Sequence, residues 1–195
     1  MSIHSNGIVP PVAYYPDFLD ATESRDWFDR SQHLAWARDE INMYGRKIPV
    51  PREECLYGDD LRYQYRGTTI KALPWPGFLL DARDRIQDLS GYLLNFAVGN
   101  RYLSGKDSIG WHADDFPQIG TDPAIASLSL GSTRTFKLKH KLNGKTFDYK
   151  LEAGSLLIML PGCQADWLHA VPKTKREVGE RINWTFRPHV DARSN

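Results

Sequence analysis

The chain has 195 residues, 41% of them hydrophobic and 25% charged, a mixture that fits one globular domain and excludes a disordered chain. The formal net charge is only +1, so any nucleic-acid binding would have to rest on local patches of lysine and arginine. Cys55 and Cys163 lack the spacing of a metal site or a disulfide framework, so a reducing compartment is the default expectation.

The chain carries no recognisable targeting or membrane segment. Residues 1–11 have no basic start followed by an apolar stretch, so we expect no signal peptide. The longest aliphatic run, Leu156 to Leu160, is too short to span a membrane. We therefore expect an intracellular protein without membrane contact, cytoplasmic in a prokaryote or nuclear in a eukaryote.

Two helices are predicted in the first half of the chain. Asp20-Ala-Thr-Glu23 resembles a capping box, and it opens a helix with apolar residues Trp27, Phe28, Leu34 and Ala35. The stretch Ile41 to Pro76 has no sustained period and predicts loops with short strands. A second helix follows Pro76, and its apolar face is formed by Leu79, Ala82, Ile86 and Leu89.

From Tyr92 onward the apolar period changes to two, which is typical of strands with one buried face. The alternating segments contain Leu94 to Val98, Ala126 to Leu130, Phe136 to Leu138, Phe147 to Leu151 and Arg181 to Arg187. Ser155 to Leu160 is continuously apolar and predicts a strand buried on both faces. Asn143-Gly144 is a hairpin turn signal. We predict a mainly β (α+β) fold, a jelly roll braced by the two N-terminal helices.

His112 and Asp114 are the first candidates for chemistry. In an extended segment, residues two apart point the same way, so both side chains can reach one ion. His169 is the candidate third ligand. Two imidazoles and one carboxylate form the ligand set of non-haem iron(II) oxygenases. The competing interpretation is a surface loop with a histidine and some acids.

The last predicted strand places Arg181, Asn183 and Arg187 on one face and apolar residues on the other. If the apolar face packs against the body, the two arginines face a polar cavity. The planar fork of arginine suits carboxylates, and 2-oxoglutarate is one dicarboxylate that would satisfy them. The alternative is a solvated polar face, with Arg181 paired to Glu180 or Glu177.

At this point the chain resembles the AlkB family of nucleic-acid dealkylases. The matching segments occur in the family's order between Leu94 and Pro188: Asn100-Arg-Tyr102, His112-Ala-Asp114-Asp115, Pro123 to Gly131, Gly154 to Met159, Trp167-Leu-His169 and Arg181 to Arg187. The resemblance implies a double-stranded β-helix that uses Fe(II), 2-oxoglutarate and O2. It implies a single domain over 1–195, with helices and a nucleotide-recognition lid in 1–91 and the catalytic core in 92–190.

The resemblance also implies residue roles. His112, Asp114 and His169 would bind iron, and Arg181 would pair with the distal carboxylate of 2-oxoglutarate. The remaining cosubstrate contacts would come from Asn100, Tyr102, Asn183 and Arg187. The implied reaction is oxidative demethylation of bases such as 1-methyladenine and 3-methylcytosine in DNA, with release of formaldehyde and succinate.

Upstream, three short segments resemble the nucleotide-recognition lid of the family member that prefers duplex DNA: Pro51-Arg52, Tyr57-Gly-Asp59 and Tyr63 to Gly67. The resemblance places Tyr63 and Tyr65 in that lid, with Tyr65 stacking on the flipped base, and Asp115 would contact a cationic lesion. Met43 and Tyr44 match the position of a hydrophobic finger, a loop that inserts into the DNA base stack where the flipped base has left a gap. The competing interpretation is that both are ordinary core or loop residues.

Backbone phosphates would be bound by a group of basic residues that we call the phosphate rim: Lys137, Lys139, His140, Lys141, Lys173, Lys175 and Arg176. A solvated strand face is the alternative. We expect a monomer that acts on alkylated DNA, with duplex favoured and single strands possible. The alternatives are an RNA or single-strand dealkylase, a dioxygenase acting on protein or a small molecule, and a catalytically inactive jelly-roll nucleic-acid-binding module.

Overall fold

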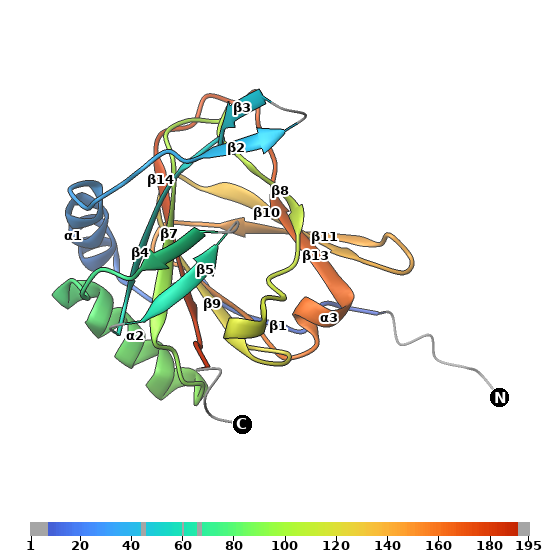
Figure 1. The fold of residues 1–195 in the computed structure, drawn as a ribbon, viewed down its shortest axis with the longest axis horizontal. Helices are drawn as coiled ribbons and strands as arrows, with labels where there is room; N and C mark the ends of the chain where they lie inside the picture. The colour runs from blue at the N-terminus through green and yellow to red at the C-terminus, as the bar shows by residue number, and fades with distance from the viewer. Residues whose placement is uncertain (1–7, 44–45, 60, 66–67, 191–195) are drawn as a thin grey trace.

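The computed structural model describes residues 8–43, 46–59, 61–65 and 68–190, and only the backbone of 41–43, 63–65 and 68. Within these residues two antiparallel sheets face each other (Figure 1). The larger sheet has the order β1-β12-β9-β14-β7-β4, with β1 Val12–Tyr15, β12 Leu156–Met159, β9 Ile125–Gly131, β14 Arg181–Arg187, β7 Phe96–Tyr102 and β4 Glu53–Gly58. The smaller sheet has the order β11-β10-β13-β8, with β11 Thr146–Leu151, β10 Arg134–His140, β13 Trp167–Val171 and β8 Ile109–His112.

Two small hairpins and the helices complete the described fold. The hairpins pair β2 (Glu40–Met43) with β3 (Arg46–Pro49) and β5 (Arg62–Tyr65) with β6 (Thr68–Lys71). The helices are α1 (Ala21–Gln32), α2 (Gly77–Ser90), α3 (Cys163–Asp166) and the 3-10 helix η1 (Pro117–Ile119). Figure 1 shows α1 and α2 on the outer side of the larger sheet. This arrangement confirms the predicted jelly roll. None of the described helices is long and apolar enough to cross a membrane.

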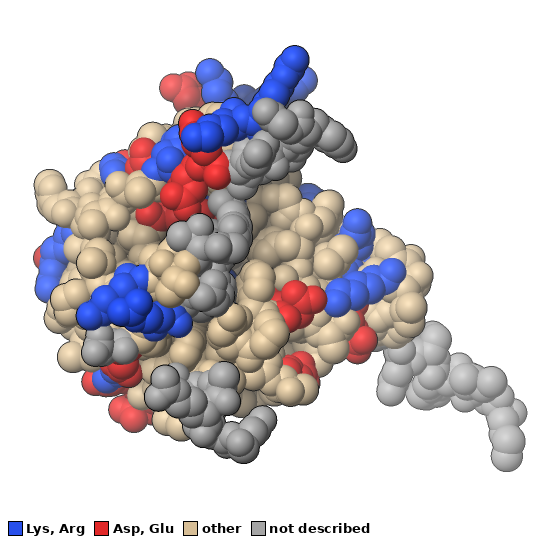
Figure 2. Space-filling model, viewed as in Figure 1, with Lys and Arg blue, Asp and Glu red and all other residues tan. Residues whose placement is uncertain are grey.

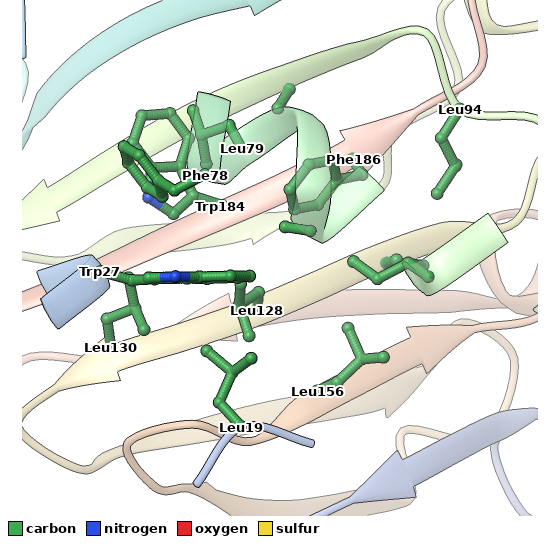
Figure 3. Packing of buried hydrophobic residues seen from close by; sticks show 14 of the residues in the cluster. Leu19, Trp27, Phe78, Leu79, Leu94, Leu128, Leu130, Leu156, Trp184 and Phe186 are labelled. Atoms are coloured by element: carbon green, nitrogen blue, oxygen red, sulfur yellow. The ribbon is translucent and has the colours of Figure 1, made fainter. Parts of the chain in front are cut away.

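The two cores lie on opposite faces of the larger sheet. One core packs α1 and α2 against the sheet through Trp27, Phe78, Leu79, Leu128 and Trp184, with neighbours shown in Figure 3. The other fills the space between the two sheets with Phe96, Ile125, Leu138, Leu157, Met159 and Trp167. Burial of these apolar surfaces is the main force holding the layers together.

Strand β14 lies between both cores, and all seven of its residues are buried. Ile182, Trp184 and Phe186 belong to the core beneath the helices. Because side chains alternate along a strand, Arg181, Asn183 and Arg187 face the space between the sheets. The predicted two-faced strand is confirmed, and the alternative of a solvated polar face is wrong, since Arg181 is 0% exposed.

The helices differ in detail from the prediction. α1 ends at Gln32, so Leu34 and Ala35 lie beyond it. In α2, Phe78 is buried with Leu79, Ala82 and Ile86, whereas Leu89 is 46% exposed. Leu89 lies in the last turn, where the helix reaches its left-handed cap at Gly91. The continuously apolar segment is confirmed as β12, whose four residues are all buried.

Half of the predicted capping box at Asp20 is confirmed. The Asp20 carboxylate accepts hydrogen bonds from the backbone N–H groups of Thr22 and Glu23, at 2.8 and 2.9 Å. Glu23 does not complete the box, because its carboxylate pairs with Arg85 on α2 at 2.9 Å. Glu23 therefore links the two helices.

Loss of the Asp20 cap is expected to destabilise the protein modestly. Asp20→Ala leaves two helix N–H groups without their acceptor, which should lower the free energy of unfolding by about 1 kcal/mol. Urea denaturation measures this difference. Asp20→Asn is the control and should retain most of the stability, since the amide oxygen still accepts. Equal stability of natural and alanine proteins would show that the cap contributes nothing.

Candidate metal centre and adjoining cavity

Three potential metal ligands converge on the inner side of the smaller sheet. His112 ends β8, Asp114 follows two residues later, and His169 lies in β13. Strand pairing sets His169 directly opposite His112. One ligand atom from each of His112, Asp114 and His169 lies within 4.8 Å of the others. The structure thus brings together the three residues that the sequence predicted.

The protonation states suit a cation. The His112 Nδ1–H donates to the Gly110 carbonyl at 2.8 Å, so Nε2 is the ring nitrogen that faces Asp114. Burial, with a smaller contribution from the neighbouring His112, lowers the pKa of His169 to about 3, so the His169 imidazole is neutral at pH 7. Burial raises the pKa of Asp114, but Arg187 and the two imidazoles outweigh it and hold that pKa well below its usual range. The centre offers one carboxylate and uncharged imidazole nitrogen, the forms that bind metals.

Arg187 holds the carboxylate of Asp114. Its Nη2 and Nε donate to Asp114 Oδ2 at 2.7 and 3.2 Å, and its Nη1 donates to Thr185 Oγ1 at 3.0 Å. Asp114 Oδ1 lies 3.8 Å from His112 Nε2. One carboxylate oxygen is therefore held by Arg187, while the other faces the imidazole. The predicted contact of Arg187 with 2-oxoglutarate stays a prediction.

A cavity of about 1210 Å³ adjoins the three ligands and extends between the sheets. Its walls include the predicted residues His112, Asp114, His169, Asn100, Tyr102, Asn183 and Arg187. Arg181 is not part of the wall, and Asp115 is exposed to solvent outside it. The cavity is large enough for a dicarboxylate and a further substrate group.

Arg181 lies behind Tyr102, with its guanidinium carbon 5.3 Å from the centroid of that ring. Its Nη2 donates to Ser129 Oγ at 3.0 Å, whereas Nε and Nη1 have no hydrogen-bond partner in the described part of the chain. Burial lowers the pKa of Arg181 to about 10. Because a buried cation with unpaired donors is costly, this position is suited to an anionic ligand. The buried arginine and the ligand set together fit 2-oxoglutarate and iron(II).

Asn100 and Asn183 are held by neighbours for which the sequence predicted no cosubstrate role: Arg52, predicted as part of the lid, and Ser127. Asn100 Oδ1 accepts from Arg52 Nε at 2.7 Å, and both residues line the cavity. The Asn183 amide donates to Ser127 Oγ at 2.8 Å and to the Leu128 carbonyl at 2.9 Å. The signal for Ser127 and Ser129 was their alternation with leucine along the predicted strand.

The predicted substrate contacts lie largely beyond what the structure describes. Tyr44 falls outside the described residues. Met43 ends β2, and Tyr63 and Tyr65 lie in β5, but their side chains are outside the described part of the chain. These four residues and Asp115 remain predictions.

The cavity mouth presents exposed apolar side chains. Ile48, Leu73 and Trp111 line the cavity and are 40%, 41% and 41% exposed. Lys139 Nζ lies 4.6 Å from the centroid of the Trp111 ring, a cation–π contact. An exposed tryptophan directly before His112 is suited to stacking on a flat ligand.

Lysine and arginine side chains lie around parts of the molecular face shown in Figure 2. Figure 2 shows lysine and arginine side chains over the β2–β3 hairpin and toward the β10–β11 hairpin, with acidic side chains beside the first group. Within the phosphate rim, Lys137 pairs with Asp148 at 2.5 Å and Lys141 donates to the Gln164 carbonyl at 2.9 Å. Lys173, Lys175 and Arg176 are exposed. Much of the rim on or directly after β10 is thus engaged within the protein, and His140, at 7% exposed, is buried and unsuited to a phosphate contact.

The chain is similar to known oxygenases in sequence and in structure. A sequence model of the 2OG-Fe(II) oxygenase superfamily matches residues 11–187. The chain is 37% identical over 191 residues to the alpha-ketoglutarate-dependent dioxygenase alkB homolog 3 of Rattus norvegicus, covering 92% of this chain and 64% of that protein. It is 36% identical over 165 residues to the DNA oxidative demethylase ALKBH2 of Mus musculus, covering 80% of this chain and 69% of that protein.

Solved structures give the same fold. A structure of OsALKBH1 matches with a TM-score of 0.68 at 18% identity, covering 94% of this chain and 99% of that chain. A 2OG-Fe(II) oxygenase family oxidoreductase from Burkholderia pseudomallei matches with a TM-score of 0.65 at 16% identity, covering 93% and 87%. At these identities the likeness concerns the fold alone.

Proposed function

The chain belongs to the 2OG-Fe(II) oxygenase superfamily and within it to the AlkB family, and from this premise we propose that it demethylates N-alkylated bases in DNA. Candidate lesions are 1-methyladenine and 3-methylcytosine. The observation that carries the proposal is the set of His112, Asp114 and His169 beside a cavity whose wall includes Tyr102, the ring that Arg181 contacts from behind. A relative named as a DNA oxidative demethylase supports the choice of DNA.

Membership of the superfamily brings Fe(II), 2-oxoglutarate and O2 as cofactor and cosubstrates. When bound, they supply the oxidation, in which 2-oxoglutarate and dioxygen become succinate and CO2 while a methyl C–H is hydroxylated, and the hydroxymethyl group then leaves as formaldehyde. His112, Asp114 and His169 would hold the metal. Arg187 would keep the Asp114 carboxylate ionised and oriented.

Residues that do not bind the metal would position the cosubstrate and shield it from water. Arg181 would donate from its two unpaired groups, Nε and Nη1, to the distal carboxylate, beside Tyr102. Arg52 and Ser127 would hold Asn100 and Asn183 in place. Arg181 and Asn183 are 0% and 6% exposed, so a carboxylate bound between them would be shielded from bulk water.

The substrate would reach the cavity through its exposed apolar mouth. Trp111, with Lys139 over its ring, would stack on a base while the ammonium group contacts a phosphate. Tyr65 and Asp115 would contact the flipped base, and Tyr44 and Met43 would fill the vacated stack in duplex DNA. We propose that duplex DNA is favoured and that the protein acts as a monomer.

Turnover of methylated oligonucleotides tests the proposed function. We expect formaldehyde release from DNA carrying 1-methyladenine or 3-methylcytosine, strictly dependent on 2-oxoglutarate, with substrate binding that weakens as salt rises. Faster turnover of RNA or single-stranded DNA than of duplex would indicate a single-strand dealkylase. No release from any methylated nucleic acid, despite 2-oxoglutarate consumption with another substrate, would indicate a protein or small-molecule dioxygenase.

Trp111→Ala is expected to weaken substrate binding specifically. Base–aromatic stacking contributes about 1–3 kcal/mol, so KM for the oligonucleotide should rise roughly 5- to 160-fold. KM for 2-oxoglutarate should stay unchanged, since Arg181 and Tyr102 are untouched. Leu142→Ala is the matched control, because Leu142 is 91% exposed on the β10–β11 turn and does not line the cavity. Equal effects of both changes on oligonucleotide KM would contradict a stacking role.

A further inference from the structure

Asp114 differs from the other two candidate ligands in how its backbone is held. His112 and His169 lie in paired strands, and their registers fix them opposite each other. Asp114 lies in the segment between β8 and η1, where no strand has been assigned. Its position therefore depends on contacts outside the sheet ladders.

The backbone N–H of Asp114 donates to Gln164 Oε1 at 2.9 Å, in a buried hydrogen bond. Gln164 is only 3% exposed and belongs to the short helix α3. Since a backbone N–H can only donate, the amide oxygen of Gln164 must face Asp114, and its NH2 group must point away. That NH2 group donates to Met159 Sδ at 3.4 Å.

Gln164 thereby joins three parts of the fold. Met159 lies in β12 of the larger sheet, and the Gln164 carbonyl accepts from Lys141 Nζ beyond β10. The helix α3 leads directly into β13, which carries His169. A single side chain thus ties the loop of Asp114 to the segment of His169 and to the opposite sheet.

The two ends of Asp114 are held separately. Arg187 binds carboxylate oxygen Oδ2, and Gln164 binds the backbone N–H. With both ends fixed, Oδ1 is directed to within 3.8 Å of His112 Nε2. A metal ligand that is already oriented loses less conformational entropy when it binds its ion.

We propose that Gln164 is a positioning residue that fixes the metal ligand Asp114 through its backbone amide. The proposal rests on the iron site put forward above. Gln164 would not touch the ion or the substrate. It would set the distance between the Asp114 carboxylate and the two imidazoles before the metal arrives.

Metal affinity measured without cosubstrate or DNA tests this role. Gln164→Met keeps the length of the side chain but removes the amide acceptor, and Gln164→Asn draws the acceptor back by one methylene. Mn(II) is the probe, titrated by calorimetry or by the EPR signal of free Mn(II). Both variants should bind Mn(II) about 10- to 100-fold more weakly, the usual effect of losing a group that orients a metal ligand. The activation constant for Fe(II) should rise equally, while kcat at saturating Fe(II) changes less.

Gln87→Met is the matched control, because the Gln87 side chain accepts the backbone N–H of Leu94 at 2.7 Å, far from the site in α2. It should leave Mn(II) affinity unchanged. If Gln164→Met does not fold, Gln164→Asn carries the test. Natural affinity in folded Gln164 variants would overturn the role of Gln164. Absence of Mn(II) binding by the natural protein would overturn the metal site itself, and this inference with it.

Discussion

His169→Ala is expected to abolish metal binding and turnover while leaving the protein folded. One ligand atom from each of three candidate residues lies within 4.8 Å of the others. Removing one residue leaves two ligands, fewer than the three protein ligands that an iron(II) oxygenase site requires. Loss of a group that only orients a ligand costs about 10- to 100-fold in affinity or activity, so loss of a ligand should cost at least ~100-fold. Anaerobic titration with Fe(II) and 2-oxoglutarate, followed by visible absorption, measures the loss directly.

A second buried histidine provides the control for His169→Ala. His140 is 7% exposed on β10, where its ring packs against Trp167, and it lies outside the cavity wall. His140→Ala removes an imidazole of the same size from the same sheet, yet should leave metal binding intact. Retention of the absorption band in folded His169→Ala would contradict the assignment of His169 as a ligand.

Much of the fold was predictable because apolar alternation reports directly which face of a strand is buried. The alternating segments became β7, β9, β10, β11 and β14. Two-sided burial of β12 followed from its continuous apolar run. β1 was missed, because four residues between prolines carry too little pattern to distinguish a strand from a loop.

The metal centre was predictable only in part from local spacing. His112 and Asp114 share a short segment, so alternation alone places them together. Their meeting with His169 depends on the pairing of β8 with β13, which no local pattern specifies. The contact between Gln164 and Asp114 joins residues fifty positions apart, and only the three-dimensional structure reveals it.

Arg181→Met is expected to raise KM for 2-oxoglutarate without destabilising the protein. A charge-assisted hydrogen bond contributes roughly 1.5–3 kcal/mol, so losing the pair between guanidinium and carboxylate should raise KM about 10- to 160-fold. Mn(II) affinity should not change, since Arg181 contacts none of the three ligands in the described structure. Initial rates at varied 2-oxoglutarate, with Mn(II) titration alongside, separate the two effects.

The stability of Arg181→Met distinguishes a binding role from a structural one. Burial lowers the pKa of Arg181 to about 10, so the folded protein holds the proton less tightly than the unfolded chain. At neutral pH the buried charge therefore opposes folding, and an apolar side chain of similar length removes that cost. We expect the thermal midpoint without ligand to stay the same or rise. Arg181→Lys keeps a charge but loses the planar fork. Its KM for 2-oxoglutarate should therefore lie between that of the natural protein and that of Arg181→Met. A lower midpoint with unchanged KM would mean that Arg181 serves the fold and not the cosubstrate.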